Sequence, residues 1–387
     1  MTGPSSPAAA TAAYAERHAA RCAPGHWRTL AGLTVSSIGL GTYLGDCGAE
    51  DDERYEAAAL ACLASGVNLL DTAINYRCQR SERALGRALR AAIEQGIAAR
   101  DEVVICTKGG YIPFDGAAPR SPRAYIEYVR ERFIEPGLCR PEELVGGNHC
   151  LAPAFLRAQV ERSRANLGVQ RIDVYYLHNP ETQLRSVDRA GFLARMRAAF
   201  ELLESLCDEG WIGVYGTATW DGYRILPDAR EHLSLRTLVA LAREVGGESH
   251  RFRVVQAPYN VVMPEAALAE TQEADPVNDD GAPPAAPWPV RPPRRKPLFE
   301  VAADMGIAAV ASATLLQSRL ARALPFELRG AFPNLRTDAQ RALHFARSTP
   351  GVTAALVGMR TPAHVRDNLA ILRIPPAVEA TRRLLGR

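Results

Sequence analysis

The sequence predicts an α/β protein whose eight parallel strands close into a (β/α)8 TIM barrel. Eight short β-type runs alternate with longer segments whose apolar residues recur three and four apart, the spacing of an amphipathic helix. Several runs end on proton-carrying side chains, and a parallel barrel builds its chemistry at the carboxyl ends of its strands. Strict strand–helix alternation implies an all-parallel sheet. An open, doubly wound sheet is the competing architecture.

The N-terminal part of the chain precedes this alternation. Residues 1–25 are rich in alanine with scattered charge, and we expect an N-terminal extension that is either disordered or a loosely docked helix. The barrel domain is expected over residues 26–387. It begins with a short hairpin from Arg28 to Val35, in which Ala31 and Gly32 form the turn.

The remaining elements follow in order along the chain. The expected strands are residues 37–40, 67–71, 103–107, 172–177, 211–216, 252–257, 307–311 and 352–357. The expected helices are residues 53–64, 81–93, 153–167, 189–207, 235–245, 298–305, 338–346 and 362–371. Glycines that resemble helix C-caps lie just beyond four of them, at Gly66, Gly168, Gly210 and Gly306.

Two long segments interrupt the alternation. Residues 111–151 follow the third strand and contain prolines, aromatics and a helical pattern, whereas residues 264–297 are proline-rich and are expected to be irregular. Long loops after barrel strands carry substrate specificity. We therefore expect the first insertion to form much of the substrate pocket, with Tyr111 and Phe114 as walls. The second should be more mobile and should tolerate deletion of residues 271–294, because it cannot bury much surface.

Composition and charge narrow the class of protein. The chain is 47% hydrophobic and 23% charged, as expected for a globular protein, and its net charge is only +3. Without a basic face, nucleic acid is not an expected partner. No apolar run approaches the roughly 20 residues that a membrane helix needs. The N-terminus lacks a signal-peptide pattern, so we expect a cytoplasmic location.

The eight cysteines do not form an obvious framework. None is part of a C-x-x-C pair, and several lie in apolar periodic segments, where free cysteine behaves as a small hydrophobe. Cys139, His149 and Cys150 fit no standard zinc spacing. We therefore expect free thiols and no metal site.

Four polar residues stand at or just past three strand ends: Asp71, Tyr76, Lys108 and His178. A phenol with a pKa near about 10 keeps its proton at neutral pH, and a nearby ammonium such as Lys108, held by Asp71, should lower that pKa. His178 could bind the substrate oxygen or pass a proton. The set suits carbonyl reduction, in which Tyr76 protonates oxygen while hydride reaches carbon. The hydride must come from a cofactor, because no side chain can donate one. Each residue alone could be structural, but together they favour an enzyme.

Three segments resemble blocks of the aldo-keto reductase family in family order: residues 69–76 (LLDTAINY), 105–108 (ICTK) and 174–178 (VYYLH). The resemblance runs from about Thr29 to Leu372. It implies a (β/α)8 barrel whose N-terminal hairpin closes the bottom. It also implies extended binding of NADPH without a Rossmann domain, and catalytic roles for the four polar residues.

The resemblance further implies a set of cofactor-binding positions. Gln256 matches a glutamine that binds the carboxamide, Thr361 stands where a helix N-terminus can meet phosphate, and Arg360 is placed to pair with a 2′-phosphate. The full implied set is Gly41, Thr42, Tyr43, Ala218, Thr219, Gln256, Ser312, Leu315, Gln317, Gly358, Met359, Arg360, Thr361, His364 and Asn368.

The chain departs from the family pattern at three places. Ala218 and Thr219 stand where serine and asparagine usually hold the nicotinamide amide, and Ser312 stands where many members carry a stacking tyrosine. Met359 and His364 replace the usual serine and arginine. We expect NADPH as the cofactor, with NADH as the alternative.

The expected function is therefore an NAD(P)H-dependent oxidoreductase that reduces a small aldehyde or ketone, or runs the reverse reaction. A Rossmann dehydrogenase is disfavoured, because residues 39–45 (GLGTYLG) misspace the glycine motif and the four carboxylates of residues 50–53 would repel a pyrophosphate. A non-enzymatic, regulatory cofactor-binding barrel that acts as an interaction module is the remaining alternative, since fold alone does not fix function.

Overall fold

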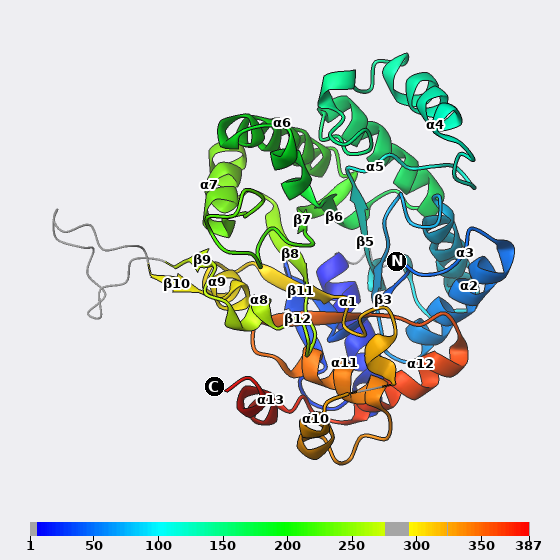
Figure 1. Cartoon of the computed structure of the whole chain (residues 1–387). Coiled ribbons are helices and arrows are strands. Elements are labelled where there is room, and N and C mark those ends of the chain that lie inside the picture. Colours follow the sequence, from blue (N-terminus) through cyan, green and yellow to red (C-terminus); the bar gives the residue numbers. More distant parts are fainter. Residues whose placement is uncertain (1–5, 275–293, 323, 387) are drawn as a thin grey trace, which may run out of the picture.

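A computed structural model describes residues 6–274, 294–322 and 324–386, and in it eight parallel strands close into a barrel (Figure 1). The barrel strands are β3 (Ile38–Gly41), β4 (Leu69–Asp71), β5 (Val104–Gly109), β6 (Ile172–His178), β7 (Ile212–Ala218), β8 (Phe252–Pro258), β11 (Ala308–Ser312) and β12 (Val352–Gly358). Their order around the barrel is β11-β12-β3-β4-β5-β6-β7-β8, and β11 pairs back onto β8. The predicted barrel is confirmed, and the open doubly wound sheet is excluded.

Helices surround the strands on the outside of the barrel (Figure 1). The principal ones are α2 (Ala49–Ala64), α3 (Arg80–Glu94), α5 (Pro153–Leu167), α6 (Arg189–Asp208), α7 (Leu235–Gly246), α9 (Leu298–Asp304), α11 (Asp338–Ser348) and α12 (Pro362–Leu369). The shorter α10 (Phe326–Ala331) and α13 (Val378–Leu384) lie near the C-terminus. Each principal helix coincides with a predicted one to within a few residues, because its apolar stripe packs on the strands. In the described parts of the chain, no helix combines the length and apolarity needed to cross a bilayer.

One apolar cluster fills the barrel interior and extends to the end of the barrel where the strands begin. Alternate residues of the strands, such as Leu69, Val104 and Val174, point inward and pack together. Leu30 and Val35 of the N-terminal hairpin, formed by β1 (Trp27–Leu30) and β2 (Leu33–Ser36), belong to the same cluster. The hairpin therefore closes the amino-terminal end of the barrel and leaves the carboxyl end open.

The N-terminal extension is an ordered, docked helix, so the expectation of disorder does not hold for its described residues. Helix α1 (Pro7–His18) is capped by Ser6 and packs against β2. Tyr14 is fully buried, and its hydroxyl donates to the carbonyl of Leu63 at 2.5 Å. Arg17 pairs with Glu102. A buried aromatic anchor and an ion pair hold the helix on the barrel.

The insertion after β5 builds its own small core beside α5. It contains α4 (Pro122–Val129), and Figure 1 shows this helix at the edge of the molecule near α5. Phe114 packs against Tyr125 and Tyr128, with ring centroids 5.9 and 5.6 Å apart. The prediction that this insertion forms much of the pocket is wrong for Phe114, whose apolar ring is covered by the aromatic residues of the insertion itself.

The second insertion is partly built into the fold. Its described parts are α8 (Glu265–Leu268) and the short antiparallel pair β9 (Gln272–Glu273) and β10 (Arg295–Lys296), whereas residues 275–293 of the predicted mobile segment lie outside the described residues. Gln272 is buried; its amide donates to the carbonyls of Tyr223 and Leu233 and accepts from the N–H of Leu235. A deletion that begins at residue 271 would remove these bonds, which the expectation of a dispensable segment did not foresee.

Candidate active site

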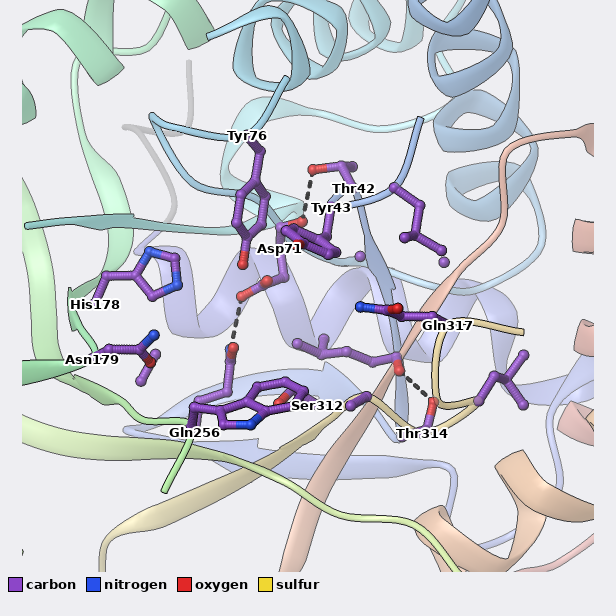
Figure 2. Close-up of a pocket in the computed structure, with 18 of the residues that line it drawn as sticks. Thr42, Tyr43, Asp71, Tyr76, His178, Asn179, Gln256, Ser312, Thr314 and Gln317 are labelled. Carbon is purple, nitrogen blue, oxygen red and sulfur yellow. Dashed lines mark hydrogen bonds between the residues drawn. The ribbon is translucent and has the colours of Figure 1, made fainter. Parts of the chain in front are cut away.

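A cavity of about 450 Å³ opens at the carboxyl ends of the barrel strands. Its wall includes the last residues of six strands, so its position follows from barrel closure. The lining residues are Gly41, Thr42, Tyr43, Leu44, Asp71, Asn75, Tyr76, Tyr111, His178, Asn179, Ala218, Thr219, Trp220, Gln256, Ser312, Ala313, Thr314, Leu315, Gln317, Ser318, Leu356 and Gly358. Figure 2 shows Tyr76, Asp71, His178 and Gln256 converging on one side, with Gln317 across the cavity.

The strand period explains why the predicted polar residues meet. On β4 and β5 the inward residues Leu69, Val104 and Cys106 fill the barrel, and the next inward positions are Asp71 and Lys108. The sequence therefore places these polar residues on the same face as the core residues below them, one layer above the apolar filling. The structure brings all four predicted catalytic residues to this layer or to the loop that covers it.

A buried ion pair forms the floor of the site. Lys108 Nζ lies 2.5 Å from Asp71 Oδ1 and donates to the carbonyl of Thr72 at 2.8 Å, and both charged side chains are at most 5% exposed. Gln256 Nε2 donates to the other carboxylate oxygen at 2.9 Å. Burial opposes the ammonium, but the charge of Asp71, the hydrogen bond to Asp71 and the interaction with Tyr76 together outweigh it and raise the pKa of Lys108. Lys108 is therefore held charged beneath the cavity.

Tyr76 stands over this ion pair. Lys108 Nζ lies 5.1 Å from the centroid of its ring, and His178 and Tyr43 pack edge-on against it at 5.7 and 5.1 Å. Burial raises the pKa of the Tyr76 hydroxyl, and the charge of Lys108 lowers it by less. Lys108 lowers this pKa as predicted, but the net shift is upward, because desolvation disfavours the phenolate more than the ammonium stabilises it. Tyr76 keeps its proton.

His178 is neutral, and a hydrogen bond to its backbone carbonyl helps to hold it in place. Burial, together with the charge of Lys108, lowers its pKa well below the ordinary value. His149, from the insertion, donates through Nε2 to the His178 carbonyl at 2.7 Å while its Nδ1 accepts from Gln183 at 2.7 Å. Tyr111 packs against both histidine rings, at 4.8 and 5.1 Å. A neutral imidazole can donate a hydrogen bond to a substrate oxygen but is a poor proton source.

Ten of the predicted cofactor-binding residues line the cavity: Gly41, Thr42, Tyr43, Ala218, Thr219, Gln256, Ser312, Leu315, Gln317 and Gly358. The other five are not in the lining and lie around the end of β12 and the start of α12: Met359, Arg360, Thr361, His364 and Asn368. Their relation to a phosphate stays a prediction.

Two of these five have partners within the protein. Arg360 pairs with Asp51 at 3.1 Å, and its side chain is 42% exposed. The hydroxyl of Thr361 caps α12 by accepting from the N–H of His364. The carboxylates at the start of α2, which argue against a pyrophosphate there, are likewise taken up by arginines: Asp52 pairs with Arg77.

Several lining residues were not predicted. Asn75, Asn179 and Trp220 each adjoin a predicted residue in sequence, so their position beside that residue could have identified them as lining residues. Ala313, Thr314 and Ser318 follow β11 in the loop that also carries the predicted Leu315 and Gln317, and each likewise adjoins a predicted residue. In the described ranges, no group of three histidine, cysteine, aspartate or glutamate side chains is arranged to hold a metal ion.

Comparison with known proteins gives a consistent picture. Residues 37–278, more than half of the chain, match the model of the Aldo/keto reductase family. A curated relative, D-threo-aldose 1-dehydrogenase from a Pseudomonas species, is 28% identical over 189 residues, which are 48% of this chain and 50% of the relative. The chain thus spans about half the length of the curated relative that it matches.

Solved structures resemble nearly the whole chain. A glycerol dehydrogenase from Gluconobacter oxydans has a TM-score of 0.59 at 17% identity, and the match covers 94% of each chain. An aldo/keto reductase from Klebsiella pneumoniae, solved in complex with NADP and acetate, has a TM-score of 0.57 at 20% identity and 91% coverage of each chain. At these identities the likeness establishes the fold.

Proposed function

The chain belongs to the aldo/keto reductase family, and from that premise we propose that it is an NAD(P)H-dependent oxidoreductase that interconverts an aldehyde or ketone with its alcohol. The observation that carries the proposal is the buried Asp71–Lys108 pair beneath Tyr76, at the open end of the barrel. Such a pair is costly to bury. Because the pair lies under a protonated phenol, it can assist proton transfer, and this role accounts for its burial.

Tyr76 is the proton donor in this proposal. Its hydroxyl is protonated in the resting site, as reduction requires, and the charge of Lys108 stabilises the phenolate that forms when the proton leaves. Asp71 keeps Lys108 charged and in position. His178 donates a hydrogen bond to the carbonyl oxygen and so fixes the substrate beside Tyr76.

The cavity suits a nicotinamide group. The Thr219 hydroxyl and the Asn75 side-chain oxygen are buried there without hydrogen-bond partners among the described residues, and a carboxamide offers both a donor and an acceptor. Thr219, Asn75 and Gln256 are the residues that would hold it. When bound, the reduced cofactor supplies the hydride. Ser312 lines the same cavity without an aromatic ring to stack on the nicotinamide.

The mouth of the cavity supports a small-molecule carbonyl substrate. Tyr43 and Trp220 remain 58% and 45% exposed at its rim, and Tyr111 and Asn179 lie deeper, where the Asn179 amide donates to the Tyr111 hydroxyl at 3.1 Å. Aromatic walls with a few polar groups are typical of small-ligand sites. No observation in the described residues favours the alternative of a regulatory interaction module.

A cytoplasmic location is part of the proposal. All eight cysteines are free. Free thiols persist in reducing compartments, whereas secreted proteins of this cysteine content usually carry disulfides.

The function is tested by two independent measurements on the full chain. Titration of NADPH and NADH, followed by cofactor fluorescence, measures binding. A panel of aldehydes, ketones and sugars, followed by the loss of NAD(P)H absorbance, measures turnover. We expect saturable NADPH binding and turnover of at least one carbonyl class. The absence of cofactor binding at high protein concentration would overturn the proposal, and binding without turnover of any carbonyl would favour the regulatory alternative.

A further inference from the structure

Two thiols meet between the loops that carry Tyr43 and Tyr76. Cys47 lies between β3 and α2, and Cys78 lies in the loop between β4 and α3. The Cys47 thiol donates to Cys78 Sγ, and the two sulfur atoms are 3.2 Å apart. Cys47 is exposed, whereas Cys78 is 6% exposed. One thiol is therefore open to a reagent in solution and has a buried second thiol directly behind it.

Arg77 holds the two loops together. Its Nε donates to the carbonyl of Asp46 at 2.9 Å, and its Nη2 donates to the carbonyl of Gly48 at 3.1 Å. These carbonyls flank Cys47, and Arg77 is the residue before Cys78. Arg77 also pairs with the buried carboxylate of Asp52 at 2.6 Å. The contact between the thiols is thus fixed by a buried charged network rather than by a chance approach of two mobile loops.

The loop of Cys78 has little freedom to move away. Arg77, Cys78 and Gln79 have φ values of 49°, 55° and 68°, in the left-handed region that side chains other than glycine rarely adopt. The Cys78 carbonyl accepts from the N–H of Gly116, and the Gln79 amide donates to the carbonyl of Phe114. The first insertion therefore holds this loop from its other side.

No other thiol among the described residues has the same combination of contact and access. Cys139 and Cys150 also interact, but both are buried, at 3% and 0% exposure. Cys62 and Cys106 are buried within apolar clusters. Among the residues that the structure describes, only the Cys47–Cys78 pair joins an exposed thiol to a second sulfur within contact distance.

We propose that Cys47 and Cys78 are an oxidisable dithiol that a hydroperoxide converts to a disulfide. The Cys47 thiolate attacks the hydroperoxide; the O–O bond breaks, an alcohol or water leaves, and Cys47 becomes a sulfenic acid. Cys78 sulfur then attacks the Cys47 sulfur; the S–S bond forms, the S–O bond breaks, and the hydroxide leaves as water with the Cys78 proton. The two thiols lose two electrons in total, and the hydroperoxide gains them.

The difference in exposure between the two thiols determines which of them attacks the hydroperoxide first. Burial, with the neighbouring thiol, raises the pKa of Cys78 to about 12, so Cys78 is a poor first nucleophile. It is well placed as the resolving thiol, because it needs to react only with the sulfur beside it.

The disulfide has a consequence for catalysis that rests on the proposed function. Sulfur atoms in a disulfide are about 2.05 Å apart, so the two sulfur atoms must approach by roughly 1 Å. Tyr76 is two residues from Cys78 and packs on Tyr43 of the other loop. Displacing a reacting group by about 1 Å can lower turnover by up to roughly 10²-fold. We expect oxidation to lower kcat reversibly.

The experiment treats the reduced full chain with hydrogen peroxide, blocks the remaining thiols with an alkylating reagent, and maps the cysteines by peptide mass spectrometry. Cys47→Ser is the test variant, since Cys47 is exposed and its loss should not disturb folding. Cys207→Ser, a half-buried thiol on α6, is the matched control. Turnover is measured before oxidation, after oxidation and after dithiothreitol.

We expect a Cys47–Cys78 cross-link in the parent chain and in Cys207→Ser, with a fall in kcat that dithiothreitol reverses. Cys47→Ser should show neither. Cys78 recovered as an alkylated thiol while Cys47 carries an oxygen adduct, or a cross-linked chain with unchanged kcat, would overturn the inference. If the reduced chain proves inactive, the proposed function fails, while the peptide map still decides whether the dithiol forms its disulfide.

Discussion

At the scale of single residues, the sequence was most informative where a strand period fixes the direction of a side chain. Asp71 and Lys108 lie at inward positions, so their meeting could be predicted from spacing. The direction of the Tyr76 pKa shift could not, because it depends on how much water the surrounding loops exclude. The ion pair of Arg360 with Asp51 was equally hidden, since it joins residues at opposite ends of the chain.

Glu181 provides a pH-dependent test of the loop that carries Trp220. Its Oε1 accepts from the N–H groups of Trp220 and Asp221, yet burial raises its pKa from 4.5 to about 7. Because the raised pKa means that the folded state holds the Glu181 proton more tightly than the unfolded state, protonation of Glu181 stabilises the fold. This contribution to the free energy of unfolding is full below about pH 4.5 and is lost as pH rises through about 7.

Relative to Glu181→Gln, the parent chain should therefore lose stability between pH 5 and pH 8, by at most roughly 3 kcal/mol. Urea unfolding at the two pH values measures the difference. Glu231→Gln, at an exposed ion pair with Arg185, is the control and should show no such trend. A parent chain that gains stability relative to Glu181→Gln as pH rises would show that Glu181 is ionised throughout.

Arg360 tests the preference for NADPH. Its side chain is exposed on one side and held by Asp51 on the other, so it can contribute a charge-assisted bond to a 2′-phosphate. Arg360→Ala should raise the Kd for NADPH by roughly ten- to a hundredfold and leave the Kd for NADH unchanged. Fluorescence titration measures both, with Arg373→Ala, at an exposed position in the turn after α12, as the control. Equal affinities of the parent chain for the two cofactors would contradict this role.

At the scale of elements, helix and strand positions followed closely from hydrophobic period, whereas the insertions did not. Helix α5 begins and ends at the predicted residues, because Pro153 starts it and Gly168, at φ 67°, ends it. The insertion after β5 has no comparable cap or turn residue that indicates which of its side chains face the cavity. Its aromatic residues could face either the site or one another, and packing within the insertion decided the outcome for Phe114.

Tyr111 and Phe114 test whether residues of the same insertion differ in role, one facing the cavity and the other packing within the insertion. Tyr111 lines the cavity and packs on His178, so Tyr111→Ala should raise KM or change the range of carbonyl substrates. Phe114→Ala should instead lower stability by roughly 0.5–3 kcal/mol and leave KM unchanged. Steady-state kinetics over the substrate panel and urea unfolding separate the two effects. A shift in KM for Phe114→Ala equal to that for Tyr111→Ala would place both side chains at the substrate.

At the scale of the whole molecule, barrel closure could be predicted because the alternation repeats eight times, and closure alone brings the strand ends together. Long-range side-chain contacts outside that repeat could not. Tyr14 anchors the N-terminal helix on the carbonyl of Leu63, and Gln272 binds the loop before α7. Neither contact has a periodic signal in the sequence, so the N-terminal segment was expected to be disordered or loosely docked and the second insertion to be dispensable.

Two deletions test whether the second insertion is part of the fold. Removing residues 271–294 takes away Gln272 and leaves the Leu235 N–H and the Tyr223 carbonyl without their partner. Each buried group left unpaired costs about 1–3 kcal/mol, so stability should fall by several kcal/mol. Removing residues 276–292 spares these bonds and should leave the urea midpoint near that of the parent chain. Equal midpoints for the two deletions would show that Gln272 contributes nothing.

In the proposed reaction, Tyr76 donates the proton that reaches the carbonyl oxygen. The most direct test of this role is the Tyr76→Phe variant, assayed with the best substrate of the panel beside a Tyr125→Phe control, whose hydroxyl binds the Gly147 carbonyl in the insertion. The phenyl ring keeps the packing with Tyr43 and His178 but has no proton to give. We expect kcat to fall by roughly 10²–10⁴-fold while the Kd for NADPH is nearly unchanged. Near-normal turnover in Tyr76→Phe would contradict this role.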